Sequence, residues 1–350
     1  MTKVVLLAAL VSIALGCAHR GGINPKAALH QRRATQLLTA DRLDEAEAEL
    51  TLALEYNPRY PEALNGLGLV AFRRGSHDAA VNYFREAIVA YPDFAEAHNN
   101  LGVVLLQRYD FAMALESFRA ALAVDPGYVN ARYNLVLTLL QLGDLATGRR
   151  ELQKVVALAP RLAEARAELG CLRLQLGDRV AADRELRQAL ALDPALGAAH
   201  RCRGRLLRVA GDLQAAEASQ RSALKADASD AEALYELGLT LALAGRSADA
   251  ERELAQLVRR RPRAAEAHFV LGYLQAKRGR TADARRAFEL ALAVRPDYPA
   301  ARLELADLLG AMGDARGARV HYEAFLKRVP VALSEHRARV EQWLKTHGPQ

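Results

Sequence analysis

The chain has 350 residues, of which 51% are hydrophobic, 25% are charged and only 6% are aromatic. This length exceeds the usual size of a single hydrophobic core, so it indicates either several globular domains or an open stack of small units. Good helix formers dominate, which favours an all-α protein. Residues 27–128 hold 9 basic and 14 acidic side chains, and residues 129–350 hold 36 and 27. Because the cations are spread along the chain, we expect no nucleic-acid partner.

The first residues have the pattern of a signal peptide. Lys3 is followed by an apolar run over residues 4–15, and the small residue Gly16 precedes Cys17. The run is too short to span a bilayer as a permanent helix, so we predict a signal peptide over residues 1–16. Ordinary secretion with a chance cysteine is the alternative.

The segment 14–17 resembles the bacterial lipobox. The resemblance implies that Cys17 is lipidated and, after cleavage, becomes the acylated first residue, with residues 17–26 as a short tether. Ala18 is similar to the second residue of enterobacterial lipoproteins that are sorted to the outer membrane. We therefore expect a protein of the bacterial cell envelope, lipid-anchored in the outer membrane and facing the periplasm.

Prolines recur with a period of 34 residues along most of the chain. The gaps between them are 34 or 68, and the phase is kept where Ala228 replaces the missing member. The prolines are Pro58, Pro92, Pro126, Pro160, Pro194, Pro262, Pro296 and Pro330. Self-similarity at this fixed period predicts a stack of short helical hairpins.

Small residues recur in the same register. Glycines on the first helix of each unit and alanines on the second would let the helices approach closely, and a further glycine would end the first helix in a left-handed conformation. The helix-ending glycines are Gly75, Gly143, Gly177, Gly211, Gly245, Gly279 and Gly313. These residues resemble those of the tetratricopeptide repeat. The resemblance implies nine 34-residue repeats over residues 27–332, stacked as a right-handed α-solenoid.

Two regions depart from the regular pattern. Repeat four has Val136 and Gly148 at the two small positions, and we expect it to pack loosely. Residues 333–350 should form a capping helix and tail, because Val340 and Trp343 are placed to cover the exposed apolar end of the last repeat. We therefore assign the single tryptophan to packing rather than to ligand stacking.

The resemblance also implies a concave groove, lined by the first helices, that binds one or more proteins or peptides. The groove residues that we single out are Asn65, Asn99, Asn100, Tyr133, Asn134, Arg201, Arg205, Arg208, Tyr235, Phe269 and Tyr273. Amides could bind an extended peptide backbone, or could serve local structure. The arginines share one helix face and would attract an acidic ligand, unless Glu236 or Glu168 of adjacent repeats pairs with them. The aromatic side chains could add contact area or pack at the core edge.

Signals for chemistry are weak. His98, His200 and His268 occupy one position in three repeats, so they cannot converge on one metal ion. Without a recognisable catalytic or nucleotide-binding motif, we predict no enzymatic activity, no cofactor, no metal and no small-molecule substrate. Cys171 and Cys202 lie on the first helices of adjacent repeats, and their spacing leaves open whether they form a disulfide.

The layout of anchor and repeats resembles that of the tetratricopeptide pilotin lipoproteins of type IV pili. The resemblance implies a non-enzymatic scaffold that assists the assembly of an envelope structure such as a type IV pilus or its secretin. The alternative is an adaptor lipoprotein that recruits periplasmic proteases or peptidoglycan hydrolases.

Overall fold

The computed structural model describes residues 24–347 of the chain. Within that range it contains nineteen α-helices, one short 3-10 helix and no strand, which confirms the predicted all-α fold. The predicted signal peptide and the lipidation site Cys17 lie outside the described residues.

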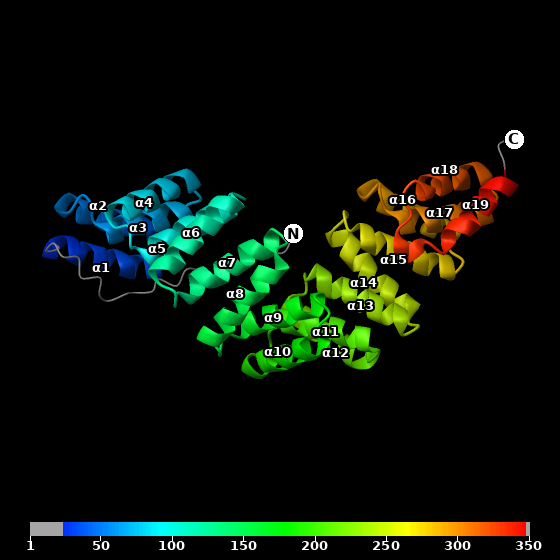
Figure 1. The fold of residues 1–350 in the computed structure, drawn as a ribbon, viewed down its shortest axis with the longest axis horizontal. Coiled ribbons are helices and arrows are strands. Elements are labelled where there is room, and N and C mark those ends of the chain that lie inside the picture. Colours follow the sequence, from blue (N-terminus) through cyan, green and yellow to red (C-terminus); the bar gives the residue numbers. More distant parts are fainter. Residues whose placement is uncertain (1–23, 348–350) are drawn as a thin grey trace. The chain divides into compact units, whose positions relative to one another are not determined.

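Eighteen of these helices alternate as the first and second helices of nine repeats (Figure 1). Within each unit, the two helices of a repeat pack against each other as a hairpin. The first helices are α1 (Pro25–Thr39), α3 (Pro61–Arg73), α5 (Ala95–Gln107), α7 (Val129–Gln141), α9 (Ala163–Gln175), α11 (Gly197–Ala210), α13 (Ala231–Leu243), α15 (Ala265–Lys277) and α17 (Pro299–Ala311). The second helices are α2 (Leu43–Tyr56), α4 (His77–Ala90), α6 (Phe111–Val124), α8 (Leu145–Leu158), α10 (Arg179–Leu192), α12 (Leu213–Ala226), α14 (Ser247–Arg260), α16 (Thr281–Val294) and α18 (Ala315–Leu326). The 3-10 helix η1 (Val331–Leu333) and α19 (His336–Thr346) follow.

The chain divides into two compact units, with the division inside α9. Unit 1 ends at Leu172 and unit 2 begins at Arg173. In unit 1 the helices α1 to α8 pack each against the next, and in unit 2 the helices α10 to α19 do the same (Figure 1).

The two helices of a hairpin approach closely where one of them lacks a side chain. A Cβ atom on Gly68 would lie 2.5 Å from the ring of Phe84, and one on Gly102 would lie 2.6 Å from the ring of Phe118. Both rings are fully buried. Because any larger residue would have to displace the ring, glycine sets the distance between the helices here.

Repeat four keeps a close approach at the small position of its second helix, where Gly148 replaces the alanine of the other repeats. Val136 is fully buried on α7, and a Cβ atom on Gly148 of α8 would lie 2.8 Å from a methyl group of Leu140. The expectation that this repeat packs loosely is therefore wrong, because Leu140 fills the room that Gly148 leaves.

Every hairpin turn needs a residue with a positive φ angle. The seven predicted helix-ending glycines all adopt it, with φ between 72° and 90°. In repeats one and three the same place is taken by Asp41 at φ 56° and by Tyr109 at φ 63°. Residues with a Cβ are less stable in this conformation. The turn geometry is therefore retained even where the residue that suits it best is absent.

The helix α19 covers the last hairpin. Val340 is fully buried, and the ring of Trp343 packs against that of Tyr322 with centroids 4.8 Å apart. Arg339 donates to both carboxylate oxygens of Asp307 at 2.8 Å. Through these contacts α19 packs on the end of the last hairpin. None of the helices between residues 24 and 347 combines the length and apolarity that crossing a bilayer requires.

Repeat six has a polar side chain in the middle of its core. The equivalent side chains of the other second helices, from α4 onward, are large, carbon-rich and buried: Phe84, Phe118, Leu152, Leu186, Leu254, Phe288 and Tyr322. The residue in α12 is Gln220, which is 0% exposed, and neither its amide oxygen nor its nitrogen has a hydrogen-bond partner among the described residues. An enclosed amide without partners lowers stability.

We predict that Gln220→Leu raises the free energy of unfolding by about 1–3 kcal/mol, because it removes two unpaired polar atoms from the core. Urea denaturation followed by circular dichroism measures the change. Gln214→Leu, at an exposed position of the same helix, is the matched control and should change stability by less than about 0.5 kcal/mol. If the Gln220 variant has the same or a lower free energy of unfolding than the wild type, the buried amide does not destabilise the protein.

We also predict that Gly204→Leu disrupts only the neighbourhood of repeat six. A Cβ atom there would lie 2.7 Å from Cγ of Gln220 and 3.2 Å from the carbonyl oxygen of Ala216. Because each repeat contacts only its neighbours, hydrogen exchange should speed up in repeats five to seven and stay slow in repeats one and two. Loss of protection throughout the chain would contradict nearest-neighbour coupling.

Candidate interaction surfaces

The predicted groove asparagines of unit 1 bind one another across successive first helices. The side-chain nitrogen of Asn100 donates to Oδ1 of Asn65 at 3.0 Å, and that of Asn134 donates to Oδ1 of Asn99 at 3.0 Å. Asn99 also donates to Oδ1 of Asn100, at 3.4 Å. This amide ladder links repeats two, three and four. The structure therefore brings together the four asparagines that the sequence singled out.

Burial limits what the amide ladder can bind. Asn99 is 1% exposed, and Asn100, Asn134 and Tyr133 are buried as well. Burial also raises the pKa of the Tyr133 hydroxyl well above its usual value, so that this group stays protonated. The prediction that Asn99 contacts a peptide directly is not supported, because its amide is enclosed and already paired. Asn65 is only partly buried and is the accessible end of the ladder.

The three histidines at the fourth position of their repeats bind the main chain. Nε2 of His98 lies 2.9 Å from the carbonyl oxygen of Pro92, and Nε2 of His268 lies 2.9 Å from that of Pro262. The same contact is made by His200 with Pro194, Arg132 with Pro126, Arg166 with Pro160 and Arg302 with Pro296. A carbonyl only accepts, so each ring must carry its proton on Nε2. These six side chains tie their own first helices to the preceding turns.

Metal-binding geometry is not found in the part of the chain that the structure describes. Within residues 24–347, no three His, Cys, Asp or Glu side chains are grouped so that they could hold an ion.

The predicted arginines of α11 share one face, and carboxylates of repeat seven pair with two of them. Arg201 lies 2.9 Å from Asp230, and Arg208 donates to Glu236 at 2.9 Å. Arg205 differs, because its Nε lies 3.9 Å from Glu236 and its side chain is 51% exposed. The alternative of pairing with an adjacent repeat thus describes Arg201 and Arg208. Arg205 is the guanidinium of this face that remains accessible.

The three predicted aromatic residues have different surroundings. Phe269 packs against Tyr298, with ring centroids 5.1 Å apart, at the edge of the core. Tyr235 is partly buried, and burial, together with the charge of nearby glutamates, raises its pKa. Tyr273 is 37% exposed and carries the Lys277 ammonium 4.7 Å above its ring. Of the three, Tyr273 is the aromatic side chain that faces solvent.

An exposed strip runs over three neighbouring first helices of unit 2. Two residues four apart lie on one face of a helix, and a shift of 34 residues places an equivalent pair on the next first helix. The strip consists of Arg205 and Val209 of α11, Leu239 and Leu243 of α13, and Tyr273 and Lys277 of α15, all of them exposed except Leu239, which is partly buried. Leu243 is 62% exposed and Val209 is 41% exposed. Val209, Leu239 and Leu243 were not among the residues predicted from the sequence, although their 34-residue spacing was a usable signal.

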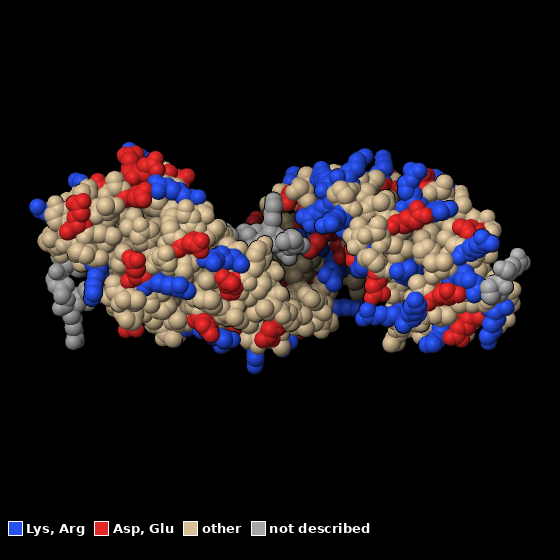
Figure 2. All heavy atoms as spheres, turned by 90° about the horizontal axis from the view of Figure 1, so that it is seen from above, with Lys and Arg blue, Asp and Glu red and all other residues tan. Residues whose placement is uncertain are grey.

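Ion pairs between neighbouring repeats occupy many of the remaining charges. Arg74 of repeat two reaches Asp44 and Glu47 of repeat one at 2.5 and 2.6 Å, and Arg246 lies 2.7 Å from Glu217. Basic and acidic side chains accordingly lie beside one another on the visible face of each unit (Figure 2). At exposed positions each such pair adds little stability. The paired arginines are, however, already bound to carboxylates of the protein and are less available to a partner.

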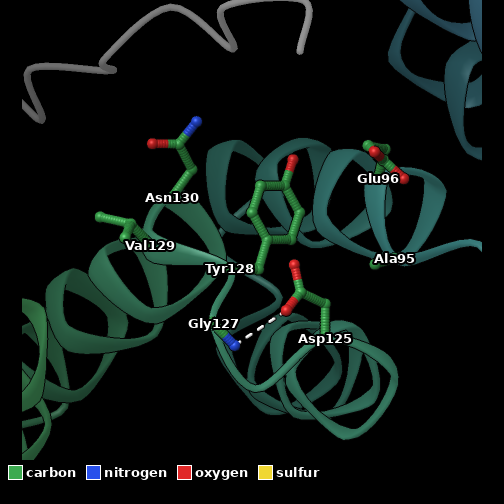
Figure 3. A pocket seen from close by; sticks show the side chains of 7 residues that line it. All are labelled: Ala95, Glu96, Asp125, Gly127, Tyr128, Val129 and Asn130. Carbon is green, nitrogen blue, oxygen red and sulfur yellow. Dashed lines mark hydrogen bonds between the residues drawn. The ribbon is translucent and has the colours of Figure 1, made fainter. Parts of the chain in front are cut away.

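Unit 1 has an open cavity of about 400 Å³ where the turn after α6 meets the start of α5 (Figure 3). Its lining residues are Ala95, Glu96, Asp125, Gly127, Tyr128, Val129 and Asn130. Asp125 accepts a hydrogen bond from the backbone nitrogen of Gly127 at 2.8 Å. The pKa of the Tyr128 hydroxyl lies far above its usual value, mainly because the side chain is buried and also because Glu96 and Asp125 are negatively charged. The cavity is therefore polar, and its tyrosine stays neutral at physiological pH.

Cys171 and Cys202 are disulfide-bonded, which resolves the question that their spacing left open. Disulfides persist in oxidising compartments and are rare in the cytosol. The bond therefore favours a compartment outside the cytosol.

Family models cover most of the chain. One model described as tetratricopeptide repeat matches residues 32–93, 77–112, 167–231, 204–253 and 235–302. A second model with the same description matches residues 105–169 and 275–335. The chain therefore belongs to the tetratricopeptide repeat family. Its fold is that of a scaffold that binds proteins or peptides.

Similarity to individual proteins is partial. "Cellulose synthase operon protein C" of Komagataeibacter xylinus is 42% identical over 72 residues, which is 21% of this chain and 6% of that protein. The protein of the same name from Komagataeibacter sucrofermentans is 40% identical over 72 residues, 21% of this chain and 5% of that protein. The matched stretch is thus a small fraction of these curated relatives.

Two solved structures have the same kind of fold. The Cut9–Hcn1 hetero-tetramer of the APC/C matches with a TM-score of 0.62 and 19% identity, over 83% of this chain and 57% of that chain. Pseudomonas aeruginosa PilF matches with a TM-score of 0.55 and 18% identity, over 59% of this chain and 95% of that chain. At this level of identity the likeness concerns the fold alone.

We predict that Asn99→Ala lowers the free energy of unfolding by about 1–3 kcal/mol, because it leaves the donor of Asn134 unpaired in a buried site. Chemical denaturation of the two proteins in parallel measures the difference. Asn82→Ala, on the exposed face of α4, should be close to neutral. Equal stability of both variants would assign the amide ladder to a role other than joining repeats.

Proposed function

We propose that the chain is a non-enzymatic, membrane-anchored scaffold that faces the periplasm and assists the assembly of an envelope structure such as a type IV pilus or its secretin. Three features support the proposal. The N-terminal sequence has the pattern of a signal peptide over residues 1–16, followed by Cys17 in a lipobox-like position. The disulfide suits the periplasm. The repeats offer surface for a partner and are matched in fold by PilF.

The observation that carries the binding role is the exposed strip of unit 2. Its centre is apolar, with Leu243 and Val209 open to solvent and the ring of Tyr273 exposed on the first helix that follows α13. Arg205 stands at one end and Lys277 at the other. Contiguous apolar side chains at a surface mark interaction sites, and charged residues at their rim set which partner fits.

A protein segment is the ligand that suits the strip. The side chains project from rigid helices, so little backbone order has to be gained on binding. Their spacing along three helices requires a ligand that extends across more than one repeat, which a peptide does and a small molecule does not. Apolar residues flanked by carboxylates would match the cations at both ends.

The test is crosslinking and affinity capture from native membranes, comparing the wild type with the double variant Val209→Asp/Leu243→Asp. Charges at the centre of the strip should reduce recovery of the partner by about tenfold or more, because they remain unpaired in the complex. Val89→Asp/Val180→Asp is the control, since both residues are exposed on second helices outside the strip. Circular dichroism should show both variants to be folded.

The identity of the captured protein decides the role. A secretin or pilus component that the strip variant loses and the control retains would support the proposal. A protease or peptidoglycan hydrolase recovered in the same way would replace it with the adaptor function. Undiminished capture by the strip variant would exclude this surface. Separately, Cys17→Ser should release the protein from the membrane fraction if the anchor is correct.

A further inference from the structure

The turn between α14 and α15 concentrates positive charge. Arg259 and Arg260 end the second helix of repeat seven, and Arg261 and Arg263 flank Pro262 in the turn itself. All four arginines are exposed. We call these four residues the arginine turn. It lies apart from the exposed strip, which is built from first helices.

The arginine turn has only one guanidinium that is bound within the protein. Arg260 donates to the carbonyl oxygen of Ala228 in the preceding turn. The side chains of Arg259, Arg261 and Arg263 make no hydrogen bond or ion pair with any other residue between 24 and 347. Cations near a helix C-terminus stabilise it, which accounts for Arg259. Arg261 and Arg263 lie beyond the helix end.

The next turn along the chain shows how such an arginine is normally bound. Arg295 is equivalent to Arg261, 34 residues on. It lies 2.6 Å from Glu266, and its guanidinium stacks 3.6 Å from the ring centroid of Tyr298. The positive charge of that turn is thus held against the protein.

Both of these partners are missing for Arg261. The residue equivalent to Tyr298 is Ala264, which offers no ring. The residue equivalent to Glu266 is Glu232, and Arg201 already lies 3.2 Å from it. The guanidinium of Arg261 therefore has no partner, because the sequence places Ala264 where Tyr298 lies in the next repeat and because Glu232 is already paired.

Arg263 reverses the charge found at the same place in the next repeat. The equivalent residue is Asp297, which pairs with Arg328 at 2.6 Å. A carboxylate that elsewhere neutralises a cation is thus replaced by another cation. The turn between α16 and α17 thus holds its positive charges in pairs with carboxylates, whereas the arginine turn does not.

We propose that the arginine turn binds an acidic segment of a partner protein. Within this chain, guanidinium–carboxylate pairs are what join neighbouring repeats, as between Arg246 and Glu217 at 2.7 Å or Arg278 and Glu251 at 2.9 Å. Three free groups of the same kind, close together, can form such pairs with carboxylates from outside. This site goes beyond the function proposed above and does not depend on the exposed strip.

The backbone presents these cations in a fixed arrangement. The nitrogen of Arg261 donates to the carbonyl oxygen of Leu257 at 2.8 Å, and the nitrogen of Ala264 donates to that of Arg261 at 3.0 Å. Pro262 restricts the turn further. An ordered backbone lowers the entropy that a complex would lose on forming.

A local cluster suits a short acidic segment better than an extended anionic surface. A membrane or a nucleic-acid duplex binds through basic residues spread over a wide face. Here the neighbouring cations Arg295 and Arg328 are paired with Glu266 and Asp297. The accessible charge therefore covers one turn, which matches a few consecutive Asp or Glu residues.

The experiment is fluorescence anisotropy of a labelled polyglutamate peptide with the full chain at low salt, with a polyglutamine peptide as the uncharged probe. The triple variant Arg259→Ala/Arg261→Ala/Arg263→Ala should bind polyglutamate about tenfold or more weakly than the wild type, because three charge-assisted contacts are lost. Polyglutamine should bind neither protein.

The control removes the same charge from the same unit at other places. Arg184, Arg286 and Arg316 are exposed and make no pair with a described residue, so their triple alanine variant should bind polyglutamate within about twofold of the wild type. An equal loss in both variants would overturn the proposal in favour of non-specific attraction. So would binding to phosphatidylglycerol vesicles that depends on the arginine turn without any binding of the peptide. Circular dichroism confirms that both variants are folded.

Discussion

The array depends on one contact, in which a large side chain of one helix fills the space that a missing side chain leaves on its partner. In the hairpins of α3 with α4 and α5 with α6, a phenylalanine lies against a glycine at a distance that admits no Cβ atom. Repeat four reaches the same closeness with its small residue, Gly148, on the other helix. What the fold requires is therefore the complementarity of the pair rather than a particular residue at a particular place. Gln220 departs from this rule in polarity, although it is as fully enclosed as the residues that it replaces.

Successive hairpins are joined by polar contacts that repeat with the chain. The amide ladder connects first helices, the fourth-position side chains bind the carbonyl of the preceding turn, and arginines reach carboxylates one repeat away. These contacts use side chains that would look like binding groups if only their sequence were considered. The protein therefore has fewer accessible polar groups than its composition suggests. The polar groups that make no contact within the array are the candidates for binding a partner.

Two kinds of surface are left over in unit 2. The exposed strip is mainly apolar, so binding there would depend on area removed from water and would respond weakly to salt. The arginine turn is mainly charged, so binding there would weaken as ionic strength rises. A scaffold with both surfaces can bind one partner through apolar packing at the exposed strip. The charge of the arginine turn can then select that same partner or bind a second one. The two surfaces come from different helices and can be tested independently.

The sequence by itself determined the repeat, its period, the helix-ending glycines and the capping role of Val340 and Trp343. These features follow from local rules, because helix periodicity and positive φ angles are decided by residues a few places apart. It could place Arg201, Arg205 and Arg208 on one face, but it could not decide which of them remains accessible, since that depends on the carboxylates of the next repeat. Likewise, the asparagines were recognisable as a series, whereas the burial of Asn99 was not. Only the tertiary structure brings residues about 30 to 35 positions apart into contact, and the competition among those neighbours decides which side chains hold the array together and which remain available to a partner.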